Sequence, residues 1–296
     1  MLVHQSPQTL RPSRVVVLGA GGFVGNAIAA RLEKDGTPVL RLARRDIDLL
    51  SPDASSRLGA LLRADDVLVA VSAMAPVRNA EMLRDNMILA ANIVKAAAAA
   101  PLAHVVNISS DAVYGDSAEP MGEDAAKSPD SLHGVMHLAR ELMFRSEINA
   151  PLAMLRPSLL YGAADPHNGY GPNRFRRLAE SGEQITLFGK GEERRDHVLI
   201  DDVAELAARV IYRRSTGALN IATGAVTSFH DIAALVVRLA GSAAPIVATP
   251  RSGPMPHNGY RAFTTAACNA AFPDFAYTPL ERGLAQTIAE ARAHAP

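Results

Sequence analysis

The chain has 296 residues, which is long enough for one large core and a second, smaller lobe. Its 30 basic and 30 acidic residues cancel to a formal net charge of zero, which excludes the charge excess typical of nucleic-acid or anionic-membrane partners. No apolar run approaches the roughly 20 residues that cross a bilayer, and the single cysteine, Cys268, excludes an intrachain disulfide, so we expect a cytoplasmic globular protein without nucleic-acid or membrane partners.

Strands and helices are predicted to alternate along the first half of the chain. Residues 1–13 are polar and contain two prolines, so we expect a loose leader there. Residues 14–18 form a continuous β-branched run, typical of a strand covered on both faces, and residues 23–32 change to helical spacing. The same criteria predict strands at 39–42, 67–71, 104–108 and 152–155, and helices at 80–100 and 132–147. This alternation predicts a parallel sheet with right-handed crossovers.

The pattern changes after Tyr161. Residues 163–172 are rich in proline and glycine, which is a loop signature, and we place a domain boundary there. We expect residues 1–162 to form a dinucleotide-binding domain, joined again by a helix at 201–213 and a strand at 218–221. Residues 163–296 should form mainly a substrate-binding lobe, with a strand near 245–247 and a helix at 280–291. The predicted fold is α/β, a Rossmann-like doubly wound parallel sheet with a smaller C-terminal lobe.

A glycine-rich turn follows the first predicted strand and opens the first helix. Glycines there permit a tight turn, close approach of a pyrophosphate to the backbone, and close packing of helix on strand. The N-terminus of the helix also offers free N–H groups to phosphates. The turn therefore predicts a dinucleotide site formed by Gly19, Gly21, Gly22, Phe23, Val24 and Gly25.

The end of the second predicted strand bears on the choice of dinucleotide. An acidic residue there usually binds the ribose 2′-hydroxyl of NAD. Here Ala43 is followed by Arg44 and Arg45, and two guanidiniums suit a 2′-phosphate, so we expect NADP. Two solvated arginines in a polar loop are the simpler interpretation. Asp46 and Asp48 lie close by and keep NAD as the alternative.

Several motifs from Val15 to the last predicted helix resemble the NAD-dependent epimerase/dehydratase family, the extended branch of the short-chain dehydrogenases/reductases. The glycine spacing of positions 19, 22 and 25 is similar to that superfamily, and the segments 109–115 (SSDAVYG) and 156–162 (RPSLLYG) are similar to its serine and nicotinamide segments. The resemblance implies a catalytic role for Ser110 with Asp111 beside it, and a role for Asn86 on the central helix. It also implies cofactor contacts from Asp48, Leu49, Ser72, Ala73 and Pro157.

The segment 185–198 (ITLFGKGEERRDHV), followed by 201–203 (DDV), resembles the family element that binds a nucleotide-linked sugar. By that resemblance, the backbone near Thr186 and the ring of Phe188 would contact the base, and Arg195 a phosphate. Asn173, at the start of the preceding helix, would contact the diphosphate or sugar, and Arg261 is a further phosphate candidate. Arginines and helix N-termini suit a diphosphate. A surface ion pair between Arg195 and Asp196 is the alternative interpretation.

The sequence departs from the family at its Tyr-x-x-x-Lys motif, where it has His133 and His137. Spacing of i, i+4 places both on one helical face. In one interpretation His133 replaces tyrosine as the acid/base, titrating near neutral pH with an ordinary pKa of about 6.5, while His137 hydrogen-bonds the ribose. In a second, catalysis is lost and the protein only binds. In a third, the pair binds a metal, although the sequence shows no third ligand.

We expect an enzyme that transfers a hydride between the nicotinamide of NADP, or alternatively NAD, and a carbon of a nucleotide-diphosphate sugar. Epimerisation and keto reduction both fit. A 4,6-dehydratase fits less well, because Ala112 follows Asp111 where the resemblance implies a second carboxyl. The alternative is a catalytically silent protein of the same fold that binds NAD(P) or a sugar nucleotide. A homodimer is a further expectation.

Overall fold

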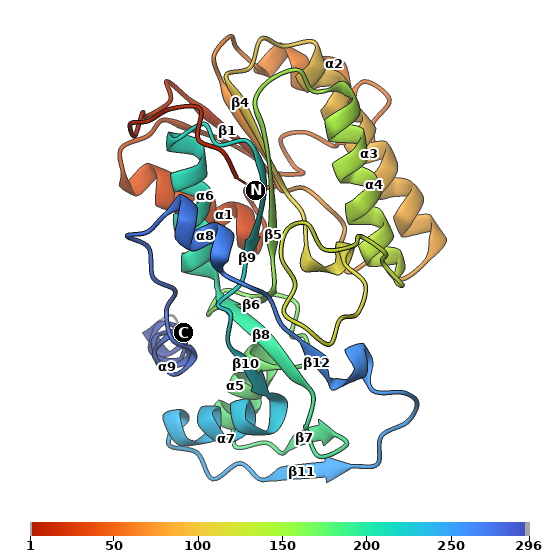
Figure 1. The fold of residues 1–296 in the computed structure, drawn as a ribbon, viewed down its shortest axis with the longest axis vertical. Helices are drawn as coiled ribbons and strands as arrows, with labels where there is room; N and C mark the ends of the chain where they lie inside the picture. Colours follow the sequence, from red (N-terminus) through yellow and green to blue (C-terminus); the bar gives the residue numbers. More distant parts are fainter. Residues whose placement is uncertain (1, 294–296) are drawn as a thin grey trace.

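The computed structural model describes residues 2–293, which form a sheet domain and a second lobe (Figure 1). The sheet has six strands in the order β2-β1-β3-β4-β5-β9, and every pair is parallel. The strands are β1 (Val15–Leu18), β2 (Val39–Leu42), β3 (Val67–Ala70), β4 (His104–Ile108), β5 (Leu152–Pro157) and β9 (Gly217–Ile221). All residues of β1, β3 and β4 are buried, as the continuous apolar runs of β1 and β3 require, and β4 also buries the polar side chains of His104 and Asn107.

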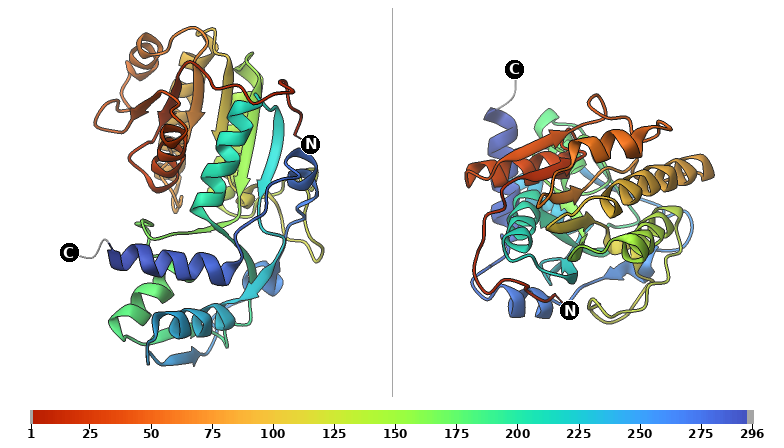
Figure 2. Two further views of the ribbon diagram at one scale, coloured as in Figure 1. Left: turned by 90° about the vertical axis from the view of Figure 1, so that its left-hand side faces the viewer. Right: turned by 90° about the horizontal axis from the view of Figure 1, so that it is seen from above.

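Helices cover both faces of this sheet (Figure 2). One face carries α1 (Phe23–Lys34) and α6 (Ile200–Tyr212), and the other carries α2 (Ala54–Leu61), α3 (Ala80–Ala98) and α4 (Leu132–Glu147). This arrangement confirms the predicted doubly wound α/β class. The strand order reverses between β1 and β3, and ligands of such sheets bind outside the carboxyl ends of the strands at that point.

The second lobe is built around β8 (Arg194–Leu199), which lies between the lobe's other strands. It pairs antiparallel with β10 (Val226–Ser228) and parallel with β6 (Leu159–Tyr161) and β12 (Tyr260–Arg261). A separate pair joins β7 (Ile185–Phe188) to β11 (Ile246–Thr249). The remaining elements are α5 (Pro172–Ser181), α7 (Phe229–Ala240), α8 (Ala266–Ala271), α9 (Leu280–Ala293) and the short 3-10 helices η1 (Asp111–Val113) and η2 (Pro256–Gly259).

The expectation of a loose leader is wrong for the described residues 2–13. Val3 and Thr216 exchange backbone hydrogen bonds of 2.8 and 2.7 Å, and Leu10 donates to the carbonyl of Tyr212 at 2.9 Å. The ring of His4 bridges the Ser215 hydroxyl and the Ala271 carbonyl. The segment is therefore fixed along the end of α6 and the start of β9, through backbone pairing that its polar composition does not reveal.

Two further observations concern the described residues. None of their helices is long and apolar enough to cross a membrane. Cys268 is a buried, free thiol on α8.

Candidate active site

A cavity of about 1370 Å³ lies at the carboxyl ends of β1 and β3 and extends to the second lobe. Its floor contains the predicted glycine turn. Gly19 has φ +85°, which favours glycine. A Cβ on Gly25 would overlap the carbonyl of Gly19, so α1 packs directly on the turn. Gly22 is the N-cap of α1 and supplies no side-chain cap, which leaves the helix N-terminus suited to a phosphate.

The rim of the cavity beside β2 contains both predicted arginines. The side chain of Arg45 is 88% exposed and lies 3.9 Å from Asp46, a weak surface pair. Arg44 has no ion-pair partner among residues 2–293. The two neighbouring carboxylates accept backbone N–H bonds instead: Asp46 from Ala43 at 2.8 Å, and Asp48 from Leu50 at 3.1 Å.

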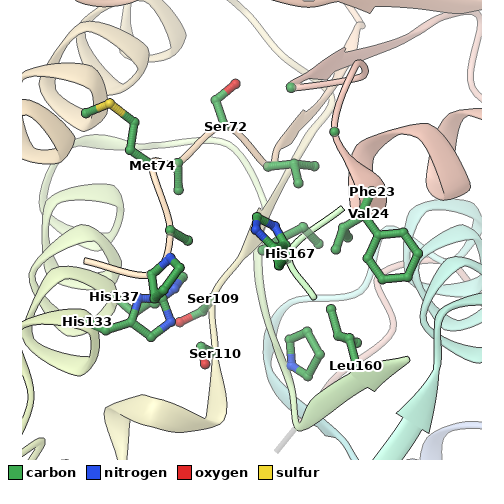
Figure 3. A pocket seen from close by; sticks show the side chains of 18 of the residues that line it. Phe23, Val24, Ser72, Met74, Ser109, Ser110, His133, His137, Leu160 and His167 are labelled. Carbon is green, nitrogen blue, oxygen red and sulfur yellow. The ribbon is translucent and has the colours of Figure 1, made fainter. Parts of the chain in front are cut away.

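His133 and His137 stand one turn apart on α4 and both line the cavity (Figure 3). Their ring centroids are 4.7 Å apart in an edge-to-face arrangement. The Nδ1 atom of each ring is buried, and neither ring has a hydrogen-bond partner among the described residues. Burial lowers the pKa of His133, against the opposing effect of Asp111, and lowers the pKa of His137 further, aided by His133 and Arg140. The expectation that His133 titrates with an ordinary pKa is therefore corrected: both rings are neutral at neutral pH.

Ser110 faces the same part of the cavity, directly after β4. Its hydroxyl accepts from the Ala112 N–H at 3.1 Å and donates to Asp111 at 3.2 Å. Gly134 sets the separation of α4 from this serine turn: a Cβ there would overlap the Ala112 carbonyl and lie 2.6 Å from the Pro129 Cβ. Direct contact between the two segments thus places the histidine pair beside Ser110 (Figure 3).

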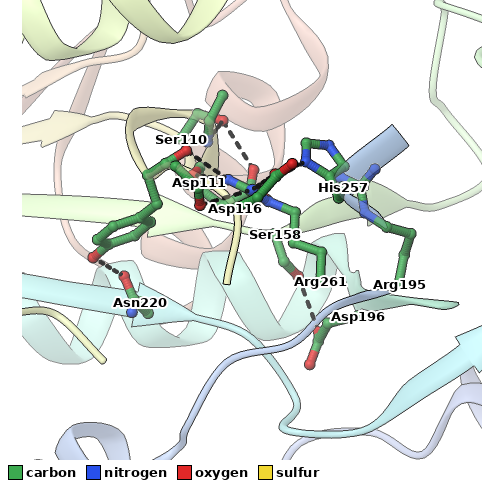
Figure 4. Close-up of polar contacts among 12 residues, drawn as sticks. Ser110, Asp111, Asp116, Ser158, Arg195, Asp196, Asn220, His257 and Arg261 are labelled. Atoms are coloured by element: carbon green, nitrogen blue, oxygen red, sulfur yellow. Dashed lines mark hydrogen bonds and ion pairs between the residues drawn. The ribbon is translucent and has the colours of Figure 1, made fainter. Parts of the chain in front are cut away.

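The second lobe reaches this serine turn through Arg261 on β12 (Figure 4). Its Nε donates to the Asp111 carboxylate at 2.9 Å, and its Nη2 donates to the Asp111 carbonyl at 2.6 Å. Nearby, His257 contacts Asp116 at 2.6 Å. Arg261 is 2% exposed and already paired with Asp111. It is therefore not the unpaired arginine that we expected to bind a phosphate.

Two side chains hold the loop after β3, which contains Ser72 and Ala73. Asn86 on α3 accepts from the Met74 N–H at 2.9 Å and donates to the Met74 carbonyl at 3.0 Å. Arg140 on α4 donates to the carbonyls of Ser72 and Ala70 at 2.5 and 2.9 Å. Asn86 is thus a positioning residue in this structure.

Arg140 supports the site from outside the cavity lining, and the sequence analysis missed it. Its guanidinium is 1% exposed and has no carboxylate partner among residues 2–293. Its Nε donates to Asn107 at 2.6 Å. Burial lowers the pKa of Arg140 to about 10, so the group stays charged at neutral pH. Its position one turn beyond His137 was visible in the sequence, but its contacts with β3 and β4 were not.

The predicted substrate residues separate into two groups. Asn173 and Arg195 line the cavity. The amide of Asn173 accepts from the Gly162 N–H and donates to Asp165, and Arg195 lies 3.1 Å from Glu193. The alternative of a surface pair between Arg195 and Asp196 is wrong, because Asp196 is buried and accepts from Ser158 and Thr223 (Figure 4).

Thr186 and Phe188 lie outside the lining of the cavity. The Thr186 hydroxyl accepts from Gln184, and Phe188 is 54% exposed. Tyr170, whose ring centroid lies 4.6 Å from that of Phe188, lines the cavity instead. The cavity also includes His167 and His257, which lie outside the motifs described above, and His197, which lies in the segment 185–198 but was not singled out there. Burial lowers the pKa of His197 to about 3.

A metal site would need further ligands beside the histidine pair. No group of three or more histidine, cysteine, aspartate or glutamate side chains gathers with metal-binding geometry within residues 2–293. The arrangement instead offers neutral imidazoles, a serine hydroxyl and a phosphate-binding turn in one cavity. That combination suits proton transfer beside a bound dinucleotide.

Comparisons with known proteins agree with this arrangement. The model of the NAD-dependent epimerase/dehydratase family matches residues 15–222. The UDP-glucose 4-epimerase of Mycolicibacterium smegmatis is 27% identical, with 77% of this chain and 83% of the relative covered. A dTDP-4-dehydro-6-deoxy-D-allose reductase from a Streptomyces species is 25% identical, with 77% and 81% covered. The solved structure of MoeE5 in complex with UDP-glucose and NAD has a TM-score of 0.82 at 24% identity, covering 95% of this chain and 99% of that one, which shows the shared fold.

Proposed function

Because the chain belongs to the NAD-dependent epimerase/dehydratase family, we propose that it transfers a hydride between a nicotinamide cofactor and a carbon of a nucleotide-diphosphate sugar. Epimerisation and keto reduction both fit, since the relatives named above include one enzyme of each kind. The observation that carries the proposal is the pair of neutral imidazoles beside Ser110, in one cavity with the glycine turn. The cavity exceeds the roughly 300–1,000 Å³ of a pocket for one drug-sized ligand, which suits a cofactor together with a substrate.

The residues of the turn fit a dinucleotide. Gly19, Gly21 and Gly22 line the cavity without side chains, which allows a pyrophosphate to approach the backbone and the N-terminus of α1. When bound, the nicotinamide supplies or accepts the hydride. We propose NADP over NAD, because Arg44 is unpaired and both nearby carboxylates are engaged by backbone N–H groups.

His133 is the proposed acid/base. A neutral imidazole accepts a proton from a sugar hydroxyl, and its lowered pKa keeps it in this form through the neutral range. The Ser110 hydroxyl orients the same sugar oxygen. His137, deeper in the cavity, contacts the nicotinamide ribose. Arg261 fixes the Asp111 carboxylate of the serine turn and acts as a positioning residue.

The substrate diphosphate is proposed to bind at Arg195 and at the N-terminus of α5. Pro172 and Asn173 begin this helix, and both line the cavity. The pairing of Arg195 with Glu193 fixes the orientation of the guanidinium while leaving further N–H donors. Charge-assisted hydrogen bonds from arginine are the usual means of binding a diphosphate.

We propose that two copies associate through α3 and α4. The outer faces of these helices expose four large apolar side chains, Ile88, Leu132, Val135 and Leu142. A monomer–dimer equilibrium measured by sedimentation tests this, and Leu142→Glu should shift it toward the monomer. A wild-type monomer at all concentrations would contradict the proposal.

The decisive experiment measures turnover of UDP-, dTDP- and GDP-sugars with NAD(H) and NADP(H), with dissociation constants measured alongside. His133→Phe should reduce turnover by roughly 10²–10⁴-fold while sparing cofactor binding. His230→Phe, at an exposed histidine of α7 outside the cavity, is the matched control. For oxidation or epimerisation, which start from the neutral imidazole, the wild-type pH–rate profile should stay level from neutral pH to below pH 6.5, because the base form is lost only below the lowered pKa of His133. For keto reduction, in which the protonated imidazole gives the proton, the rate should instead rise as the pH falls toward that pKa. Cofactor binding without turnover on any sugar nucleotide would instead support a silent binding protein.

A further inference from the structure

Tyr170 is packed into the core of the second lobe, although it lies in the loop between β6 and α5. Its ring centroid is 4.7 Å from that of Phe229 and 5.1 Å from that of Phe175, and both phenylalanines are buried. On its other side, the ring lies 4.6 Å from Phe188 at an angle of 32°, close to a stacked arrangement. Moving this ring would expose Phe175 and Phe229, so the packing favours a fixed position.

The hydroxyl of Tyr170 accepts a hydrogen bond of 3.1 Å from the backbone N–H of Phe188. Tyr170 therefore does two things that a planar, oxygen-bearing base would do at this place: it stacks on the Phe188 ring, and it accepts from the Phe188 N–H. Tyr170 lines the cavity, whereas Phe188 and Thr186 do not. The phosphate-binding groups, Arg195 and the N-terminus of α5, remain open to the cavity.

We propose that Tyr170 determines substrate specificity by closing the end of the site beside Phe188, where the base of a sugar nucleotide would bind. The protein then selects sugar nucleotides by their diphosphate and sugar, and it discriminates little between bases. This inference rests on the proposed function, which places the diphosphate at Arg195 and the sugar beside His133. Strong selection between ligands needs site hydrogen bonds that the wrong ligand leaves unmade. The backbone N–H of Phe188 already donates to the Tyr170 hydroxyl, so the base receives few directional contacts from the protein.

The test is calorimetric titration of the cofactor-loaded protein with UDP-glucose, dTDP-glucose and GDP-glucose. For the wild type we expect the three dissociation constants to agree within about five-fold, since a net hydrogen bond is worth roughly two- to ten-fold. Tyr170→Phe keeps the ring packing and frees the Phe188 N–H. It should create a preference of roughly two- to ten-fold for a base with a suitably placed carbonyl. Tyr260→Phe, at a tyrosine outside the cavity, is the matched control and should leave the ratios unchanged.

The possible outcomes separate this inference from the proposed function. Equal affinities in the wild type, with a preference appearing in Tyr170→Phe, support the inference. A wild-type preference of more than about thirty-fold for one base, unchanged in Tyr170→Phe, overturns it and leaves the proposed function intact. If no sugar nucleotide binds to the wild type or to Tyr170→Phe while the cofactor binds to both, the proposed function fails and this inference fails with it.

Discussion

Replacing His137 with lysine should destabilise the protein, because the new ammonium would be buried beside Arg140. His137 is 6% exposed, and Arg140, one turn further along α4, is a buried guanidinium without a carboxylate partner among the described residues. Side chains three residues apart on a helix are about 5–6 Å apart at their Cβ atoms. At about 5 Å and an effective dielectric constant of about 20, two unit charges repel by roughly 3 kcal/mol.

The assay is urea unfolding followed by circular dichroism, from which the free energy of unfolding is extrapolated. His137→Met, which introduces no charge, is the control. The loss in His137→Lys should diminish as pH rises. A buried lysine has a folded-state pKa below its unfolded value of about 10.4, so the unfolded state binds more protons and stability increases with pH up to about that value.

A double-mutant cycle with Arg140→Met isolates the repulsion from the other costs of each change. Arg140→Met alone should destabilise, because it leaves the Ala70 and Ser72 carbonyls without their donor. In the His137→Lys background the same change should cost less, with a coupling of roughly 1–3 kcal/mol. Additive effects within about 0.5 kcal/mol, or a stability loss independent of pH, would refute the reasoning. Confirmation would explain the family departure: a buried arginine at position 140 is incompatible with a lysine at 137.

The other predictions concern ligand binding. Arg44→Ala and Arg45→Ala should each weaken NADP(H) binding by roughly 1.5–3 kcal/mol and leave NAD(H) binding nearly unchanged; equal calorimetric affinities of the wild type for both dinucleotides would contradict this. Arg195→Ala should weaken sugar-nucleotide binding without affecting dinucleotide binding. An equal loss of affinity for both ligands would indicate a role in folding. Thermal unfolding of the variant checks for such a role, because Arg195 contacts Glu193. Asn86→Ala should raise the cofactor dissociation constant, because the Met74 backbone loses both bonds to the Asn86 amide; an unchanged constant would exclude that positioning role.

Much of the sheet domain could be predicted because its signals are local. Continuous apolar runs such as residues 15–18 identify buried parallel strands, and the glycine turn follows from backbone requirements alone. The helix α7 was missed although its signals were present: Ser228 caps the Asp231 N–H at 3.0 Å, and Gly241 ends the helix with φ +63°. The domain boundary at residue 162 stays a prediction.

The parts of the site that could not be predicted depend on contacts between distant segments. The role of Arg140 comes from carbonyls at the end of β3 and in the loop after it, and that of Tyr170 from a backbone N–H 18 residues away. The charge state of His133 depends on burial, which a histidine in a sequence does not reveal. Spacing placed the two histidines on one face, while the folded structure determines how they titrate.

Position 133 offers a general lesson for redesigning enzymes. The approach of α4 to the serine turn is set at Gly134, where the helix touches the Ala112 carbonyl and Pro129, and not by the imidazole next to it. An amine, thiol, carboxyl or phenol introduced at 133 would therefore start from nearly the same backbone coordinates relative to Ser110. If His133 is the acid/base as proposed, the group that transfers the proton can be exchanged at this position while the backbone that positions it stays the same.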